Sequence, residues 1–400
     1  MSSKTYDYGD LRVTMTDSYQ WSWDDRGSGA RRDICVWTPV FQGSLRPLGH
    51  YADPNRYSEI NGKRASLLVG QNPNTNPSKP AVAQPVDYNL VWTDKGSGGK
   101  YDGAFWRPIP PNGYIALGDV CTSSWNKPST GDIWCVRKDF FVNGSFSTTS
   151  VWDDKGSGSR SDVSVWEIKP APMGVQGSAY LPIEGDTFRA QGNYSHPDNE
   201  AAPVLQLPVG KNYHRFEADA PLMEANQLPE KGERFYHQPQ CSITLPFHCF
   251  FSPNSKASLA NIRSPFLTIT KSIAWYAECV WVNRTDETVW HQENIRYGVN
   301  KEKREEIKGN VGVEFSSTKG VVLSNSGLTL NYQFADNSSR FLPEYSVRES
   351  AESFEIPPST ASALFTQRTW IKCSPTGSDI VVGEAEILQS TDYRYKGCVL

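Results

Sequence analysis

The chain has 400 residues, a formal net charge of −4, 38% hydrophobic residues and 21% charged residues. This balance is typical of a folded globular protein and excludes an intrinsically disordered chain. The mildly acidic composition also argues against a nucleic-acid-binding protein, which carries a basic surface. Because one core seldom organises so long a chain, we expect two domains. The polar N-terminus and the lack of any long apolar run predict neither a signal peptide nor a transmembrane helix.

One pattern occurs three times in the first half of the chain, as WDDRGSGARRDICVW, WTDKGSGGKYDGAFW and WDDKGSGSRSDVSVW. Each copy opens on Trp, at Trp23, Trp92 and Trp152, and closes on a second Trp at position +14. Asp stands at +2 and +10, basic residues at +3 and +8, and Gly-Ser-Gly at +4 to +6. Such an internal repeat indicates one supersecondary unit used three times.

The repeated pattern predicts a β-hairpin with a long tip. Asp followed by Gly-Ser-Gly is turn chemistry, because Asp bonds the backbone two residues on and Gly adopts positive φ. The runs around the tips are short, alternate in polarity and are broken by Gly, Pro and Asn, with no helical period. This spacing predicts an all-β fold. Three equal repeats predict a three-sided β-prism over residues 1–212.

Two interpretations of the tips remain open. In one, the Asp pair ties down a structural hairpin and the Trp pair fills the core of the prism. In the other, the tips form a three-fold binding rim for a sugar, a lipid head group or Ca²⁺, with the carboxylates as oxygen ligands. No cofactor is expected apart from such a Ca²⁺. The candidate ligand-binding residues are Trp23, Asp25, Asp33, Trp92, Asp94, Asp102, Trp152, Asp154 and Asp162.

These motifs resemble the vacuolar protein sorting-associated protein 62 family. The resemblance rests on the three hairpins, on PNGYIALGDVCTSSWNKPSTGDIWCVRKDF (residues 111–140) and on TFRAQGNYSHP (residues 187–197). It covers about the first half of the chain and implies a β-prism module. It brings no catalytic residues. Relatives of this arrangement occur attached to pore-forming or insecticidal modules.

The second half, residues 213–400, lacks the hairpin motif and has longer alternating runs. Residues 309–335 alternate between apolar and small or polar side chains. A membrane-spanning β-hairpin needs this pattern over arms of about 9 to 11 residues. A long, half-exposed strand pair in an ordinary β domain carries the same alternation. The candidate membrane-insertion residues are Val311, Val313, Phe315, Leu328, Leu330, Tyr332 and Phe334.

The order of motifs in the second half resembles the aerolysin-like pore-forming modules. VWVNRTDETV is followed by a long Ser/Thr-rich and charged region and then by SFEIPPSTASALFTQRTWIKCSPTG. In those modules an Asn-x-Thr turn precedes the insertion hairpin and a Pro-Pro turn precedes a late strand. The resemblance implies an elongated antiparallel β domain. The charged block from Lys301 to Lys308 departs from a clean lipid-facing strand.

No motif points to catalysis. The sequence contains no G-x-S-x-G, no H-E-x-x-H and no G-x-G-x-x-G. It contains no C-x-x-C, and the spacing of Cys241, Cys249, His237 and His248 matches no metal site. We therefore expect a protein that is not an enzyme.

We hypothesise a β-barrel pore-forming toxin or defence protein, with insecticidal action as one form. It would bind a cell-surface glycan, lipid or receptor, form a homo-oligomer on a target membrane and insert a hairpin. No nucleic acid is expected as a partner. The alternative is a non-lytic, lectin-like or membrane-trafficking adaptor. The expected localisation is a soluble cytoplasmic store, or release by a non-classical route, with action at the target-cell membrane.

Overall fold

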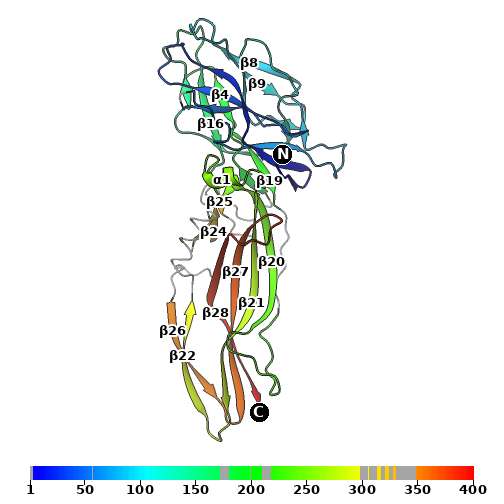
Figure 1. The fold of residues 1–400 in the computed structure, drawn as a ribbon, viewed down its shortest axis with the longest axis vertical. Helices are drawn as coiled ribbons and strands as arrows, with labels where there is room; N and C mark the ends of the chain where they lie inside the picture. The colour runs from blue at the N-terminus through cyan, green and yellow to red at the C-terminus, as the bar shows by residue number, and fades with distance from the viewer. Residues whose placement is uncertain are drawn as a thin grey trace. The chain divides into compact units, whose positions relative to one another are not determined.

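The computed structural model describes residues 3–55, 57–171, 180–198, 200–209, 218–297, 305, 313–316, 320–323, 328–329 and 348–400. The strands of these residues pair antiparallel throughout (Figure 1). The helical elements among them are short: η1 (Lys138–Phe140), η2 (Phe247–Cys249) and α1 (Lys256–Ala260). The all-β prediction is confirmed.

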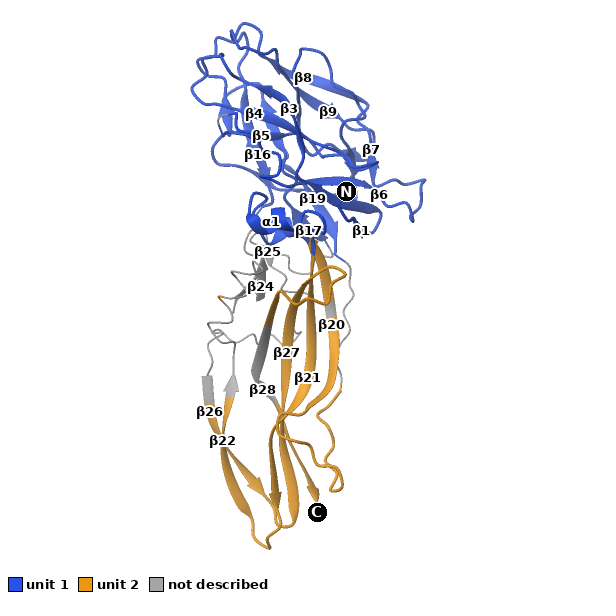
Figure 2. Cartoon of the chain, viewed as in Figure 1, with its two compact units in different colours: residues 1–173, 179–209, 246–266 blue, residues 174–178, 210–245, 267–400 orange. Residues whose placement is uncertain are grey.

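The chain forms two compact units (Figure 2). The first comprises residues 1–173, 179–209 and 246–266, and the second comprises residues 174–178, 210–245 and 267–400. The sequence placed one boundary after residue 212 and did not foresee that residues 246–266 belong to the first unit. Within that unit, Lys4 N–H donates to the Arg263 carbonyl at 2.9 Å, and Ala65 N–H donates to the Pro253 carbonyl at 3.0 Å.

Each repeat of the first unit builds the same three-stranded arrangement. The first two strands pair as the predicted hairpin, and the third strand pairs with the second. The three-repeat architecture is therefore confirmed. The strands are β3 (Tyr19–Asp24), β4 (Cys35–Pro39) and β5 (Tyr51–Asp53); β8 (Asp87–Thr93), β9 (Ala104–Ile109) and β11 (Val120–Thr122); and β15 (Trp152–Asp153), β16 (Ser164–Lys169) and β18 (Phe188–Gln191).

A second set of sheets closes each repeat on itself. The strand before each hairpin pairs with the strand after it: β2 with β6, β7 with β12, and β13 with β19. β1 pairs with β2, β10 with β12, β17 with β19, and β14 with β16. These strands are β1 (Tyr6–Tyr8), β2 (Leu11–Thr16), β6 (Ser66–Gln71), β7 (Val82–Ala83), β10 (Tyr114–Ile115), β12 (Cys135–Arg137), β13 (Phe141–Asn143), β14 (Ser145–Phe146), β17 (Tyr180–Ile183) and β19 (Pro203–Pro208).

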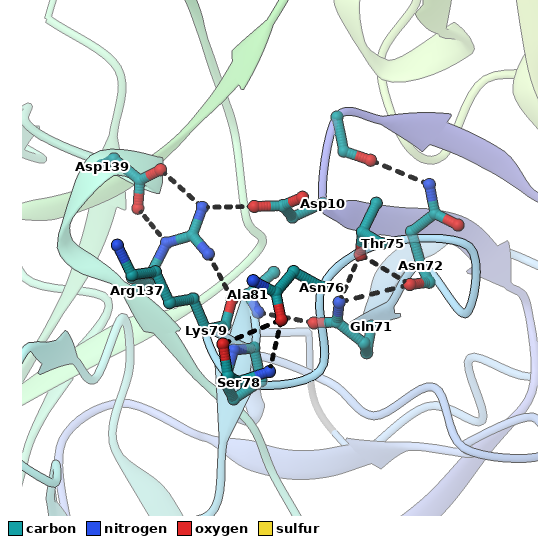
Figure 3. A network of polar contacts seen from close by, with 12 residues as sticks. Asp10, Gln71, Asn72, Thr75, Asn76, Ser78, Lys79, Ala81, Arg137 and Asp139 are labelled. Carbon is teal, nitrogen blue, oxygen red and sulfur yellow. Dashed lines mark hydrogen bonds and ion pairs between the residues drawn. The ribbon is translucent and has the colours of Figure 1, made fainter.

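The connection from the first repeat to the second is held by a polar network (Figure 3). Gln71, at the end of β6, accepts a hydrogen bond from the Ala81 backbone N–H at 2.5 Å. Arg137 on β12 donates to the Lys79 carbonyl and pairs with Asp10 at 2.7 Å. Strands from two repeats thus anchor a linker rich in Asn, Ser and Pro.

The second unit contains a sheet of long strands in the order β20-β21-β27-β28. They contain 13, 18, 16 and 17 residues, well above the usual length of about five or six. A two-stranded ribbon, β22 with β26, and a three-stranded meander, β23-β24-β25, complete the unit. The strands are β20 (Arg234–Pro246), β21 (Phe266–Asn283), β22 (Val289–Tyr297), β23 (Val313–Ser316), β24 (Gly320–Leu323), β25 (Leu328–Thr329), β26 (Arg348–Ile356), β27 (Thr360–Pro375) and β28 (Gly383–Val399).

Candidate binding tips and candidate insertion segment

The first Trp of each repeat lies in a shared core. Trp23, Trp92 and Trp152 are 1%, 2% and 0% exposed, and their ring centroids lie 5.6 to 5.8 Å apart. Each indole N–H also donates to a backbone carbonyl of another repeat. The acceptors are Tyr101 at 3.2 Å, Ser161 at 2.8 Å and Arg32 at 2.8 Å. Fully buried indoles offer no surface to a ligand, so the structure assigns these three predicted site residues to the core.

The tips of the three hairpins form a closed ring of backbone hydrogen bonds. The N–H at +8 of each repeat donates to the carbonyl at +3 of another, at 2.7 to 3.2 Å. The pairs are Lys100 to Arg26, Arg31 to Lys155, and Arg160 to Lys95. Both glycines of every Gly-Ser-Gly have positive φ, between 69° and 93°. The repeated glycines are therefore explained by backbone conformation.

The Asp at +2 shapes each tip from inside. Asp25, Asp94 and Asp154 are 3%, 5% and 3% exposed, and each backbone carbonyl accepts a hydrogen bond from the Ser at +5, at 2.9 to 3.0 Å. The side chain of Asp25 also accepts from the Ile34 N–H, and that of Asp154 from the Val163 N–H, at 3.1 and 3.0 Å. Burial raises the pKa of both carboxyls above its ordinary value.

An aromatic residue from a later loop caps each tip, and the sequence analysis missed it. Trp125 Nε1 donates to Asp94 Oδ1 at 2.7 Å, and the Tyr57 hydroxyl donates to Asp25 Oδ1 at 2.9 Å. In the third repeat Tyr194 takes the corresponding place, and its hydroxyl donates to Asp162 Oδ1, the Asp at +10, at 2.9 Å. These residues follow the third strand of each repeat at unequal distances from the motif. The repeated pattern alone therefore could not identify them.

The basic residue at +3 stacks on the same aromatic ring. Lys95 Nζ lies 4.5 Å from the centroid of Trp125, and Lys155 Nζ lies 4.5 Å from that of Tyr194. Arg26 lies 5.1 Å from the centroid of Tyr57 and also pairs with Asp24 at 2.6 Å. Each tip is thus a stack of cation, aromatic ring and carboxylate, in which the carboxylate is buried and the cation reaches solvent.

The Asp at +10 stays closer to the surface. Asp33 is half-buried and accepts from the Tyr57 hydroxyl at 3.0 Å, whereas Asp102 and Asp162 are exposed. A Ca²⁺ site needs six to eight oxygen ligands. Among the described residues no group of three or more His, Cys, Asp or Glu side chains is arranged to hold a metal ion. Ca²⁺ binding at the tips stays a prediction.

The tips expose basic side chains beside the carboxylates of Asp102 and Asp162. Six basic residues, two per repeat, stand at +3 and +8; Arg26 is half-buried and the other five are exposed. The ring of backbone bonds brings each +8 residue beside the +3 residue of another repeat. We call this set the tip cations: Arg26, Arg31, Lys95, Lys100, Lys155 and Arg160.

The candidate insertion segment is only partly described. Val313 and Phe315 lie on β23 and Leu328 lies on β25. In the described part of this stretch, β24 stands between the two arms and pairs with both, so these residues form three short strands in the structure. The insertion hairpin stays a prediction. The remaining predicted positions lie outside the described residues: Val311, Leu330, Tyr332 and Phe334.

The ribbon of β22 and β26 carries this segment between its strands. Its register runs without a shift from Val289↔Ile356 to Tyr297↔Arg348. One face of the ribbon is buried, since Ile295, Phe354 and Ile356 are 3%, 7% and 1% exposed. These side chains pack in one cluster with residues of β21 and β27.

Asn283 joins the two turns at the start of the ribbon. Its Nδ2 donates to the carbonyls of Glu287, Ile356 and Pro357, at 2.8, 3.0 and 3.0 Å. Its Oδ1 accepts from the Thr285 backbone N–H at 3.0 Å. The Asn-x-Thr turn and the Pro-Pro turn, which the sequence analysis singled out separately, therefore meet at one buried side chain.

Comparison with known proteins identifies one family. Residues 1–225 match the family described as vacuolar protein sorting-associated protein 62. The crystal structure of GNIP1Aa from Chromobacterium piscinae is 30% identical over 47% of this chain, with a TM-score of 0.38, and the match spans 34% of its length. The crystal structure of Cry35Ab1 is 11% identical over 98% of this chain and 90% of its own, with a TM-score of 0.36. No curated protein matches the chain.

The helices give no sign of a membrane span. In the described parts of the chain, none of them has both the length and the apolar character needed to cross a bilayer.

Proposed function

The chain belongs to the vacuolar protein sorting-associated protein 62 family, and from that premise we propose that it is a pore-forming protein of the toxin or defence kind. The three-repeat unit binds a cell surface. Several copies then assemble on the membrane, and a β-hairpin from the second unit enters the lipid. The proposal assigns no catalysis to the chain.

The register of the ribbon is the observation that carries this proposal. β22 and β26 end level with each other at Tyr297 and Arg348. If the two strands were extended beyond Tyr297 and Arg348 in the same register, the predicted apolar positions of one arm would pair with those of the other. The resulting pairs are Val311 with Phe334, Val313 with Tyr332, and Phe315 with Leu330.

The apolar face also continues in phase. Side chains alternate between the two faces of a strand with a period of two. The extended pairs therefore fall on the same face as Ile295 and Phe354, which are buried in the ribbon. A lipid-spanning hairpin needs one apolar face, and closure by several copies satisfies its backbone groups.

The meander and the extended hairpin are alternative pairings of one sequence. In the structure Val313 pairs with Leu323, whereas the continued register pairs Val313 with Tyr332. The extended form would place the apolar Val322 and Leu323 at the leading tip. The meander thus corresponds to the stored state and the hairpin to the inserted state.

The tip cations support the surface-binding step. Basic residues near an anionic membrane surface contribute about 1 kcal/mol each, and repeated weak contacts add up through avidity. Their ring arrangement allows several of them to meet one surface together.

A disulfide that locks the meander tests the proposal. In a Cys398→Ser background, Val313→Cys with Leu323→Cys joins two directly paired positions of β23 and β24. We expect the oxidised protein to bind vesicles rich in phosphatidylserine but to release no trapped dye, and we expect reduction to restore release. The matched control, Gln292→Cys with Ser353→Cys, joins ribbon positions that stay paired in both states and should leave lysis intact.

Undiminished lysis with the first disulfide closed would contradict the proposed insertion segment. A protein that binds these vesicles without assembling or releasing dye, even when reduced, supports the alternative function instead, that of a non-lytic adaptor.

A further inference from the structure

The first unit contains a cavity of about 390 Å³ between the first and second repeats. Its size lies within the range of small-molecule sites, roughly 300 to 1,000 Å³. β3, β4 and the residue before β5 contribute Ser22, Thr38 and His50, and the loop after β11 contributes hydroxyl and amide side chains. Phe41, 51% exposed, stands at its rim.

A directed chain of hydrogen bonds leads into this cavity. The Cys121 backbone N–H donates to His50 Nδ1 at 3.1 Å, so the neutral ring carries its proton on Nε2. His50 Nε2 lies 3.1 Å from Thr38 Oγ1, which lies 2.6 Å from Ser22 Oγ. With Nε2–H donating to Thr38, one of the two hydroxyls donates to the other, and the hydrogen of the remaining hydroxyl, on Ser22 or Thr38, is left for a group in the cavity.

The chain of bonds stays neutral. Burial lowers the pKa of His50 to about 3, so its imidazole is uncharged at pH 7. The cation on the lining, Lys127, is paired with Asp87 at 2.6 Å, and the other charged lining residue is the carboxyl of Asp132. At the rim the Arg46 guanidinium lies 4.0 Å over the ring of Phe41 and acts on the carboxyl of Asp132. The charged groups near the cavity are therefore balanced by partners of their own, which favours a neutral ligand.

The corresponding places in the other repeats carry charged or apolar residues. Where the first repeat has Thr38 opposite His50, the second has Arg107 with Asp119, an ion pair at 3.3 Å that Arg189 extends at 3.0 Å. The third has Glu167 opposite Phe188. At the position of Ser22 the other repeats have Val91 and Val151. At these two positions the first repeat has small neutral hydroxyls, Ser22 and Thr38, where the other repeats have charged or apolar residues. Both hydroxyls line the cavity.

A larger cavity, about 720 Å³, lies in the second unit and is less suited to a ligand. Its acidic side chains, Glu224, Glu230 and Glu233, are exposed, and Leu222 on its wall is 81% exposed. No fixed chain of hydrogen bonds comparable to that of His50 leads into it among the described residues.

We propose that the smaller cavity binds a neutral saccharide unit. A sugar supplies hydroxyl oxygens to accept from Ser22 or Thr38 and hydroxyl donors for the loop amides, and Phe41 offers an apolar ring to its C–H face. The inference deepens the surface-binding step of the proposed function and rests on it. It places glycan recognition between repeats and leaves the tip cations to meet the membrane surface.

Saturation-transfer NMR on the full chain tests this inference. The probes are millimolar methyl glycosides of glucose, galactose, mannose and N-acetylglucosamine, with N-acetylneuraminic acid as the charged comparison. We expect transfer to at least one neutral glycoside. Ser22→Val, which installs the residue of the other two repeats, should weaken that binding at least tenfold. Ser145→Val, the same change at an exposed position of β14, should leave it unaltered.

Thermal melting shows whether Ser22→Val folds, and Thr38→Val replaces it if it does not. Absence of transfer to every neutral glycoside, transfer only to the charged sugar, or binding that survives both variants would overturn the inference. This assay needs no membrane. Sugar binding without dye release therefore removes only the pore-forming proposal, and dye release without sugar binding removes only the saccharide site.

Discussion

The two units of this protein hold their segments by different kinds of contact. In the first, bonds between repeats close a ring: each core indole and each tip amide is satisfied by another copy of the motif. In the second, the strands are long and each is satisfied by its neighbour along a ladder. Each repeat takes part in two of the three ring bonds, so the failure of one repeat leaves a single bond, whereas a ladder opens from its end one pair at a time.

Within the first unit, residues shared by all three repeats have a structural role, whereas residues that differ between repeats line the candidate binding cavity. Residues repeated in all three copies, such as Trp23, Gly27 and Asp25, fix the ring and are explained by it. Residues that differ between copies, such as Ser22 and Thr38, are those that line the cavity. In the second unit the proposed function assigns a change of pairing to the alternating stretch between β22 and β26.

Gly103→Ala should break the ring with the largest effect. A Cβ atom at this position would lie 2.3 Å from Trp23 Nε1, and the indole is fully buried with no room to retreat. We expect a loss of about 3 kcal/mol in the free energy of unfolding, since overpacking a core costs roughly 1–3 kcal/mol. Urea unfolding followed by near-ultraviolet circular dichroism measures it. Gly131→Ala, where an added Cβ meets no atom closer than 3.5 Å, is the control and should change little.

Much of the ring could be predicted from the sequence, because its chemistry is local. The hairpins at Trp23, Trp92 and Trp152, the turn role of Asp and the Gly-Ser-Gly tips all follow from short-range rules. The sequence could not decide whether the Trp residues fill the core or line a binding rim. Burial depends on how three distant hairpins meet, and a motif that fills a core looks the same in sequence as one that lines a rim.

Each feature that the sequence analysis missed depends on contacts between segments that lie far apart in the chain. Tyr57, Trp125 and Tyr194 reach the tips from loops of unequal length, so no fixed spacing marks them. The cavity at Ser22 arises from a difference between repeats and becomes visible only when the copies are aligned on their neighbours in space. The three-stranded pairing of β23, β24 and β25 depends on long-range register, and alternation alone does not distinguish it from a single hairpin.

Asn283→Ala should loosen the ladder at the start of the ribbon. The change removes four hydrogen bonds to backbone groups of two turns. The Glu287 and Pro357 carbonyls keep donors in the hydroxyls of Thr285 and Thr360, whereas the buried Ile356 carbonyl loses its side-chain donor. We expect a cost of about 2 kcal/mol, because unsatisfied buried polar groups cost about 1–3 kcal/mol each. Hydrogen exchange should report faster opening of β22 and β26 with β8 and β9 unchanged. Asn294→Ala, an exposed position on β22, is the matched control. Equal protection of β22 in both variants would show that the turns do not depend on Asn283.

Substitution of the two aspartates of the third tip should have the smallest effect on the free energy of unfolding. It should also distinguish a structural carboxylate from one that contacts a ligand. Asp154 is buried and accepts from the Val163 N–H at 3.0 Å, whereas Asp162 is exposed. Asp154→Ala leaves that N–H unsatisfied, but it also relieves a carboxyl whose pKa is raised by burial, so the net loss in the free energy of unfolding should be only about 1–2 kcal/mol. Asp162→Ala should stay within about 0.5 kcal/mol of the parent protein, as expected for an exposed site.

Urea unfolding of the two variants and of Asp154→Asn, which keeps an acceptor oxygen, measures the difference. Vesicle or Ca²⁺ binding by the folded variants then tests the surface role. Loss of binding in Asp162→Ala at unchanged stability would assign ligand contact to the exposed carboxylates, because nothing in the ring of hydrogen bonds depends on them. Equal destabilisation by Asp154→Ala and Asp162→Ala would contradict the division drawn here between a buried carboxylate that holds the tip and an exposed one that accepts from Tyr194 and faces solvent.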